Sequence, residues 1–298
     1  MKHSDLMNYF PKPILLLLLC LLGSCNTESR KSWDFTDEHV FTPGIEGPAV
    51  NSRGELFAVN FEREGTVGIV DENGKGRVFL ELPEGSIGNG IRFDSYGNMF
   101  IADYMAHRVY RVPAGSNVPE IWAEQPNMNQ PNDLTIGKQG QLYLSDPNWS
   151  NNTGRLWMVD PQRNVVLLED QMGTTNGIEV NPEGNILYVN ESVQRKVWKY
   201  DILPGGRIDN KQLFIAFKDF GMDGMRCDEK GNLYITRFEK GTVVIVSPEG
   251  EILDEIVLKG KKPSNITFGG KERKTCYVTM ADRGAFEAFY ALYPGKSN

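Results

Sequence analysis

Polar side chains recur at one position of a sequence repeat and could together bind a metal ion. Eight residues before each of five regularly spaced glycines lies a carboxylate or an amide, and a sixth polar residue lies near the equivalent point of the last repeat: Glu46, Asn89, Asn132, Asn176, Asp223 and Ser264. Two carboxylates held about 5 Å apart repel by roughly 3 kcal/mol at an effective dielectric near 20, and a divalent cation between them removes that repulsion. With Glu46 and Asp223 as anions and Asn132 and Asn176 as amide donors, the ligands are hard oxygens, which favour Ca²⁺; Mn²⁺, Mg²⁺ or Zn²⁺ could substitute.

Turn formation is the alternative explanation for three of these residues. Asn89, Asn176 and Asp223 each precede a glycine, and Asn-Gly and Asp-Gly pairs are strong turn formers that could simply start strands. Glu46-Gly47 and Asn132-Asp133 are not typical turn pairs, yet they keep the same phase. We therefore favour a metal ring over the turn interpretation.

The elements that must position this ring are short strands in a repeat. A turn glycine followed by an apolar strand recurs at spacings of 43, 43, 44 and 47 residues, namely at Gly54, Gly97, Gly140, Gly184 and Gly231. Such periods, with about four alternating strands in each repeat, are typical of β-propeller blades. In the third repeat the expected strands are 133–136, 141–145, 155–159 and 164–168. We expect an all-β, six-bladed propeller of four-stranded antiparallel blades over residues 33–298, with no second domain.

The innermost strand of each blade would bring the ring residues to the central channel. The sixth repeat, by contrast, ends after residues 286–292 with no fourth strand. The segment 38–41 has the pattern to supply that strand, and closure by an N-terminal strand would remove the open edges of the ring.

The first residues have the pattern of an export signal. The apolar run 14–22 follows Lys2 and Lys12 and is too short to span a bilayer. The segment 22–25, Leu-Gly-Ser-Cys, resembles the bacterial lipobox, in which the signal is cut before a cysteine that becomes lipidated. We expect a signal peptide over residues 1–24, then lipidated Cys25 and a tether over residues 25–32, with export to a bacterial membrane facing the periplasm or the cell surface. An ordinary cleaved signal is the alternative.

Composition restricts the partners and the chemistry. The net charge is −7 and 40% of residues are apolar, which excludes a disordered chain and argues against a nucleic-acid binder, since phosphate binding needs a surplus of cations. Only His39 and His107 remain after the signal, too few for a histidine-rich zinc site. Cys227 and Cys276 lie in apolar strand patterns and are expected to be buried thiols. We expect a monomer that takes a small-molecule substrate and contacts a membrane through its lipid only.

Four motifs resemble those of the gluconolactonase, regucalcin (senescence marker protein) and luciferin-regenerating enzyme family. They are Glu46-Gly47-Pro48, Pro131-Asn132-Asp133, Thr175-Asn176-Gly177-Ile178 and Asp223-Gly224-Met225, and the likeness covers nearly the whole mature chain. The resemblance implies a six-bladed propeller with a central catalytic Ca²⁺ bound by Glu46, Asn176 and Asp223, with Asn132 as a fourth ligand or a substrate contact. One departure is Gln130, where many sugar lactonases of the family have an arginine, so a specificity for sugar-acid lactones does not follow.

The same resemblance implies a calcium-dependent hydrolase that opens a lactone ring by attack of water, with Asp223 as the favoured base. Asp146 and Asp103, at strand ends on the same face, are further candidates, although hydrogen bonds to neighbouring loops would equally explain them. The expected substrate contacts are Asn89, Asn132, Asp146, Trp149 and Arg237. Arg226 and Arg283 are expected to be surface cations. A phosphotriesterase-like hydrolase and a non-catalytic surface binding propeller are the alternatives.

Overall fold

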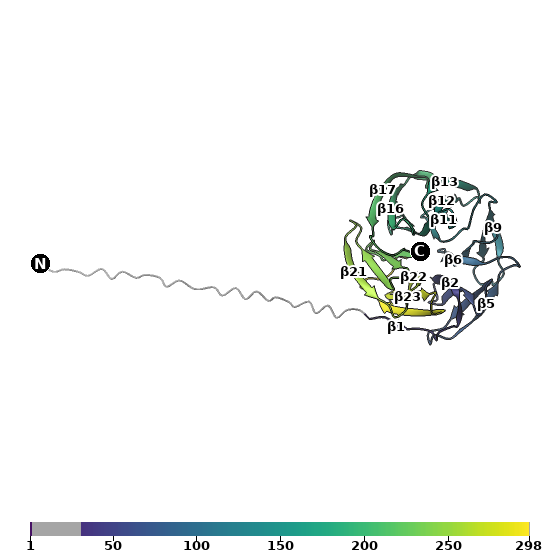
Figure 1. Cartoon of the computed structure of the whole chain (residues 1–298), viewed down its shortest axis with the longest axis horizontal. Coiled ribbons are helices and arrows are strands. Elements are labelled where there is room, and N and C mark those ends of the chain that lie inside the picture. The colour runs from purple at the N-terminus through teal and green to yellow at the C-terminus, as the bar shows by residue number, and fades with distance from the viewer. Residues whose placement is uncertain (2–30, 298) are drawn as a thin grey trace.

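Six sheets of four antiparallel strands surround a central axis in the computed structural model, which describes Met1 and residues 31–297 (Figure 1). The first blade comprises β2 (Phe41–Val50), β3 (Leu56–Phe61), β4 (Thr66–Val70) and β5 (Gly76–Glu81). The second comprises β6 (Gly88–Phe93), β7 (Met99–Asp103), β8 (Arg108–Val112) and β9 (Glu120–Glu124). The third comprises β10 (Leu134–Ile136), β11 (Leu142–Asn148), β12 (Thr153–Val159) and β13 (Val165–Met172).

The other three blades repeat this order. The fourth comprises β14 (Thr175–Val180), β15 (Ile186–Glu191), β16 (Lys196–Ile202) and β17 (Ile208–Ala216), with a 3-10 turn, η1 (Pro204–Gly206), before the last strand. The fifth comprises β18 (Met225–Cys227), β19 (Leu233–Arg237), β20 (Thr242–Val246) and β21 (Ile252–Val257). The sixth comprises β22 (Pro263–Gly269), β23 (Thr275–Met280), β24 (Ala285–Tyr290) and the N-terminal β1 (Trp33–Asp34). The predicted six-bladed propeller is confirmed.

The N-terminal strand closes the ring, but it is not the segment that the sequence pattern favoured. β1 pairs with β24 through Trp33 opposite Ala288, whereas residues 38–40 form a turn that leads into β2. Val40 and Phe41 instead pack in an apolar cluster that joins the first blade to Phe286 of the sixth. The prediction of strand 38–41 is therefore wrong, while the prediction of closure by an N-terminal strand is confirmed.

Ion pairs strengthen this closure. Arg283, expected to be a surface cation, is largely buried, and its guanidinium lies 2.7 Å from carboxylate oxygens of Asp34, Glu38 and Glu287. Asp34 also accepts a hydrogen bond from Lys259 at 2.6 Å, and these two cations hold the pKa of the Asp34 carboxyl below its ordinary value despite partial burial. The two ends of the propeller are therefore joined by charge as well as by the strand pairing.

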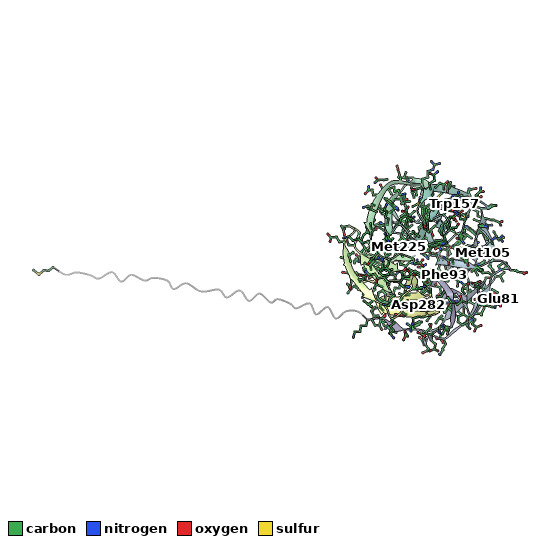
Figure 2. The ribbon with its side chains drawn as sticks, viewed as in Figure 1. Glu81, Phe93, Met105, Trp157, Met225 and Asp282 are labelled. Carbon is green, nitrogen blue, oxygen red and sulfur yellow. The ribbon has the colours of Figure 1, made fainter. Side chains whose placement is uncertain are left out.

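Apolar side chains fill the spaces between neighbouring blades, and Figure 2 labels Phe93, Trp157 and Met225 among the residues of these clusters. One such cluster joins Phe57 and Val59 of the first blade to Ile91 and Phe93 of the second. Cys227 lies in another of these clusters, and it and Cys276 are buried, as predicted. In the part of the chain that the structure describes, no helix is long and apolar enough to cross a membrane. The predicted signal peptide and Cys25 lie outside the described residues.

The C-terminal segment ends near the central axis (Figure 1). Gly295 forms a β-bridge with Asp228, and the Lys296 backbone N–H donates to Cys227 at 3.0 Å. The Lys296 ammonium enters the channel, where it lies 2.7 Å from a Glu179 carboxylate oxygen and donates to the Val180 carbonyl at 2.7 Å. The tail thereby supplies a counter-charge for a carboxylate that is almost fully buried.

We expect Lys296→Met to lower the free energy of unfolding by about 3 kcal/mol, because it leaves the buried Glu179 carboxylate without its closest cation. Chemical denaturation of the purified protein measures this loss. Lys75→Met is the control, since Lys75 pairs with Asp37 in an exposed position and its removal should leave the midpoint unchanged. Equal midpoints for the Lys296 variant and the wild type would contradict a stabilising role of the tail.

Candidate metal centre

The starts of the innermost strands meet around the channel axis, where hydrogen bonds link them. The Gly90 N–H donates to the Asn132 carbonyl at 2.8 Å, and the Gly224 N–H donates to the Ser264 carbonyl at 2.7 Å. The Asn89 side chain also donates to the Asn132 carbonyl, at 3.1 Å. The sequence repeat therefore brings its polar position to one end of the channel, as predicted.

Glycines that follow ring residues permit this close approach. A Cβ atom on Gly177 would lie 2.3 Å from the Asp223 carbonyl, and one on Gly224 would lie 1.9 Å from the Asn265 side chain. Asn176 is the second residue of β14 and not the corner of a hairpin. The glycines of these Asn-Gly and Asp-Gly pairs are thus required for packing between blades, and the turn explanation is not needed.

Glu46 and Asp223 form a pair of carboxylates in a poorly hydrated place. Burial raises the pKa of Glu46 to about 7, and the negative charge of Asp133 acts in the same direction. Burial also raises the pKa of Asp223 well above its ordinary value, followed by repulsion from Glu46, while a hydrogen bond from Asn176 partly opposes the shift. Negative charge near each carboxylate therefore raises the free energy of ionising it, from Asp133 for Glu46 and from Glu46 for Asp223, and a bound cation would reverse this.

The amide oxygens suit the same ligand. Asn176 is 2% exposed, and its Oδ1 atom is buried without a hydrogen-bond donor among the described residues. An unpaired buried oxygen of this kind costs stability unless a ligand satisfies it. Asn132 is half-buried beside it in the ring. Across the described ranges no three His, Cys, Asp or Glu side chains gather in one metal site, so the candidate is a mixed set of two carboxylates with amide oxygens. This set fits a hard cation.

Asp146 is buried and bonded to the loop before Asn132. It accepts hydrogen bonds from the Asn129 and Gln130 backbone N–H groups at 2.7 Å and from the Trp157 indole at 2.8 Å. Burial raises the pKa of the Asp146 carboxyl despite these bonds. Its counterpart Asp103 likewise accepts from backbone N–H groups of its own blade. Both carboxylates support loops at the ring end, which is the alternative role that the sequence allowed.

Arg237 is also enclosed. It is 1% exposed, its Nη2 atom donates to an Asp219 carboxylate oxygen at 2.9 Å, and its guanidinium carbon lies 3.8 Å from the ring centroid of Phe217. It therefore fixes the loop that carries Asp223. Trp149, in the turn after β11, is 41% exposed at the same end of the third blade. Contacts of Asn89, Asp146, Arg237 and Trp149 with a substrate stay predictions.

Two residues of the site were missed by counting from the glycines. Ser264 turns its hydroxyl to the Ile45 carbonyl at 2.8 Å, and the next residue, Asn265, donates to Glu46 Oε2 at 3.0 Å. Asp133 follows Asn132, is buried, and accepts a hydrogen bond from Arg92 at 3.0 Å. The sequence did contain a signal for these two residues. The position directly after each ring residue is glycine in four of the six blades, whereas in the other two it is Asp133 and Asn265.

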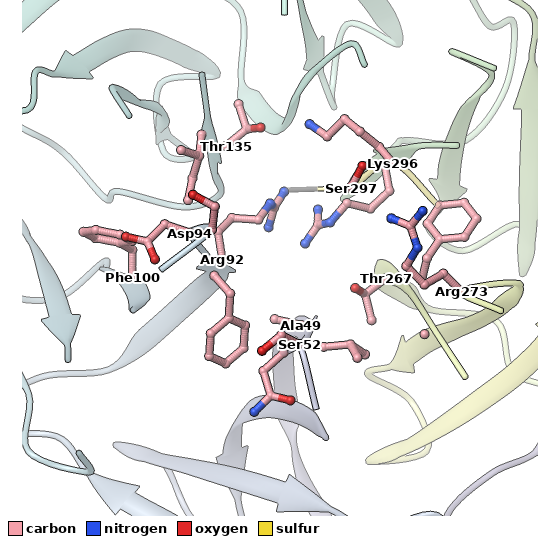
Figure 3. A pocket seen from close by; sticks show the side chains of 18 of the residues that line it. Ala49, Ser52, Arg92, Asp94, Phe100, Thr135, Thr267, Arg273, Lys296 and Ser297 are labelled. Carbon is pink, nitrogen blue, oxygen red and sulfur yellow. The ribbon is translucent and has the colours of Figure 1, made fainter. Parts of the chain in front are cut away.

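A second ring of inward residues lies three positions after the first: Ala49, Arg92, Thr135, Glu179, Arg226 and Thr267. All six line a cavity of about 1570 Å³ at the other end of the channel (Figure 3). The expectation that Arg226 is a surface cation is wrong, because its strand position directs it inward and only 7% of it is exposed. Burial, and then the neighbouring charge of Arg92, lower the pKa of Arg226 to about 10.

The fold and the site together define the class of protein: a six-bladed propeller with two carboxylates and amide oxygens on its axis. The family model described as SMP-30/Gluconolactonase/LRE-like region matches residues 45–282, and the chain belongs to this family, as its motifs indicated. It is 27% identical over 211 residues to 6-deoxy-6-sulfogluconolactonase of Pseudomonas putida, covering 68% of this chain and 71% of that protein. It is 26% identical over 296 residues to diisopropyl-fluorophosphatase of Loligo vulgaris, covering 88% and 93%. The crystal structure of regucalcin, a calcium-binding protein from Agrobacterium tumefaciens, shares the fold with a TM-score of 0.76 at 18% identity, covering 91% of this chain and 95% of that one.

The raised pKa of Glu46 predicts a pH-dependent cost in metal-free protein. Between its ordinary pKa of 4.5 and its folded value of about 7, Glu46 is ionised in the unfolded chain but still protonated in the fold. Raising the pH through this window therefore destabilises the fold. With chelator present, we compare the free energy of unfolding of Glu46→Gln with that of the wild type. This difference should change by about 2 kcal/mol in favour of the variant as the pH rises from about 5 to about 7. Denaturant titrations at several pH values measure this, and a difference that does not change with pH would contradict it.

Proposed function

We propose that the protein is a calcium-dependent hydrolase that opens a lactone ring. The observation that carries the proposal is the Glu46 and Asp223 pair on the channel axis, with both pKa values raised and the buried Asn176 oxygen unpaired beside them. Such a set is unfavourable without a cation and suitable with one. Membership in a family with a lactonase relative supports the choice of reaction.

Glu46, Asn176 and Asp223 would hold the ion, with Asn132 as a fourth ligand or a substrate contact. When bound, Ca²⁺ would supply positive charge that polarises the lactone carbonyl and stabilises the oxyanion. Asp223 would accept a proton from the attacking water. Asn190 and Arg237 keep this carboxylate in place, the first through a 2.6 Å hydrogen bond to the Asp223 carbonyl and the second through the 217–223 loop. Asn89, Asp146 and Trp149 are the other proposed contributors to substrate binding.

The substrate differs from that of many sugar lactonases if Gln130 alters the grip on sugar hydroxyls. The Gln130 backbone is fixed by Asp146, so the substitution changes the chemistry of this position while its backbone stays anchored. The similarity to diisopropyl-fluorophosphatase supports a second candidate, a phosphotriesterase-like hydrolase with attack at phosphorus. The same residues would serve both reactions, and substrate assays distinguish them.

We predict that Asp223→Asn lowers lactone turnover at least 100-fold, since it removes both a charged ligand and the proposed base. The assay uses residues 26–298 with a panel of sugar, aliphatic and aromatic lactones, and with a phosphotriester. Wild-type turnover should disappear with EDTA and return with Ca²⁺. Asp37→Asn, on the surface, is the control and should leave turnover unchanged. Full turnover in Asp223→Asn, or turnover in EDTA, would contradict the proposal.

We further propose that the mature protein is a monomer, exported and held at a bacterial membrane by lipid on Cys25, facing the periplasm or the cell surface. The apolar run 14–22 and the lipobox-like segment 22–25 support export and lipid anchoring. Cys25→Ala should move the protein from the detergent-extracted membrane fraction to the soluble fraction. Cys227→Ala, at a buried thiol, is the control and should stay in the membrane fraction. Retention of Cys25→Ala in the membrane would contradict lipid anchoring.

A further inference from the structure

The side chain of Asn265 lies between the candidate metal centre and the charges beneath it. It is 1% exposed. Its Nδ2 atom donates to Glu46 Oε2 at 3.0 Å and approaches Asp133 Oδ2 at 3.4 Å. Its Oδ1 atom accepts from the Ile266 backbone N–H at 2.9 Å and from Arg226 at 3.4 Å. Only one orientation of the amide satisfies these four neighbours, because carboxylates accept and guanidinium and N–H groups donate.

The hydrogen bonds to Glu46 converge on one of its two oxygens. Glu46 Oε2 accepts two hydrogen bonds, one from the Gly47 backbone N–H at 2.9 Å and one from the Asn265 side chain. Among the described residues, no hydrogen bond is made to Oε1. The two donors therefore fix the carboxylate plane through Oε2 and leave Oε1 available to a ligand on the axis.

Asn265 is in turn supported by buried ions. Asp133 Oδ1 accepts from Arg92 at 3.0 Å, and Arg226 Nη1 lies 3.7 Å from Asp133 Oδ2. Arg226 also donates to the Pro48 carbonyl at 3.2 Å, and Arg92 lies 3.7 Å from Glu179. These contacts hold both guanidinium groups in place, so the partners that orient the Asn265 amide are themselves fixed.

We propose that Asn265 is a positioning residue for the Glu46 carboxylate, oriented by Arg226 and Asp133. This inference rests on the proposed calcium site. Groups that orient a metal ligand typically change affinity 10- to 100-fold when removed. Without the Asn265 amide, Glu46 retains a single donor on Oε2 and can rotate, so it would have to be ordered again each time an ion binds.

Calorimetric titration of the purified protein with Ca²⁺ tests the inference. Asn265→Ala should weaken binding 10- to 100-fold, with the circular dichroism spectrum retained. Asn265→Ser is a second variant that keeps a small polar group near the Ile266 N–H but cannot reach Glu46, and it should show the same loss. The matched control is Asn232→Ala, since Asn232 is also buried and donates to a carboxylate, Asp228, at 2.8 Å. The Ca²⁺ affinity of the Asn232→Ala protein should stay within twofold of that of the wild type.

A double-mutant cycle separates positioning from general damage to the fold. In a Glu46→Gln background, with titration extended to millimolar Ca²⁺, adding Asn265→Ala should change the affinity less than twofold, because its effect passes through the Glu46 carboxylate. An equal loss in both backgrounds, or an unchanged affinity in the single variant, would overturn the inference while leaving the calcium site intact. Failure of the wild type to bind Ca²⁺ would overturn the proposed function and this inference together.

Discussion

Repulsion between the Glu46 and Asp223 carboxylates is the constraint on which the rest of this structure depends. Both acids are half-buried, and burial together with neighbouring negative charge, Asp133 for Glu46 and Glu46 for Asp223, raises the pKa of each. A fold maintains such an arrangement only if its other contacts hold the two groups in place against that repulsion. Here the rigidity comes from hydrogen bonds between the starts of the innermost strands and from glycines that allow these strand starts to approach one another closely.

The propeller provides this rigidity because its blades are joined into a closed ring. Moving Glu46 away from Asp223 would require moving β2 away from its neighbours, which pack against it on both sides. The ring in turn stays closed through β1 and the ions around Arg283, far from the axis. Stability at the periphery therefore maintains an unfavourable electrostatic arrangement at the centre.

The parts of the fold and site that repeat along the chain could be predicted from the sequence, whereas those that do not repeat could not. The turn glycines and the residue eight positions earlier recur in nearly every blade, so their period revealed the fold and the first ring. Asn265 and Asp133 do not repeat, since the equivalent position is glycine in the other four blades, and only this departure from glycine marks them. The burial of Arg226 likewise cannot be predicted from composition, because an arginine on a strand looks like a surface cation until the blades place four charged neighbours around it. The segment 38–41 was mistaken for β1 because a short apolar pattern alone does not say which sheet a strand joins, or whether it forms one.

The charges along the channel explain how two half-buried acids can coexist with a site for a cation. The four axial carboxylates are Glu46, Asp133, Glu179 and Asp223, and the cations beneath are Arg92, Arg226 and Lys296. With all seven groups ionised, the net charge of this set is −1 without a metal ion. A bound divalent cation would change it to +1. The channel is thus nearly balanced in both states, and neither a large surplus of negative charge nor one of positive charge has to be buried. Because the fixed cations lie beneath the first ring and not within it, they moderate the repulsion without occupying the ring. A bound ion would then compete with protons on Glu46 and Asp223 more than with the guanidinium groups, and its affinity should rise as the pH rises through the window in which Glu46 titrates.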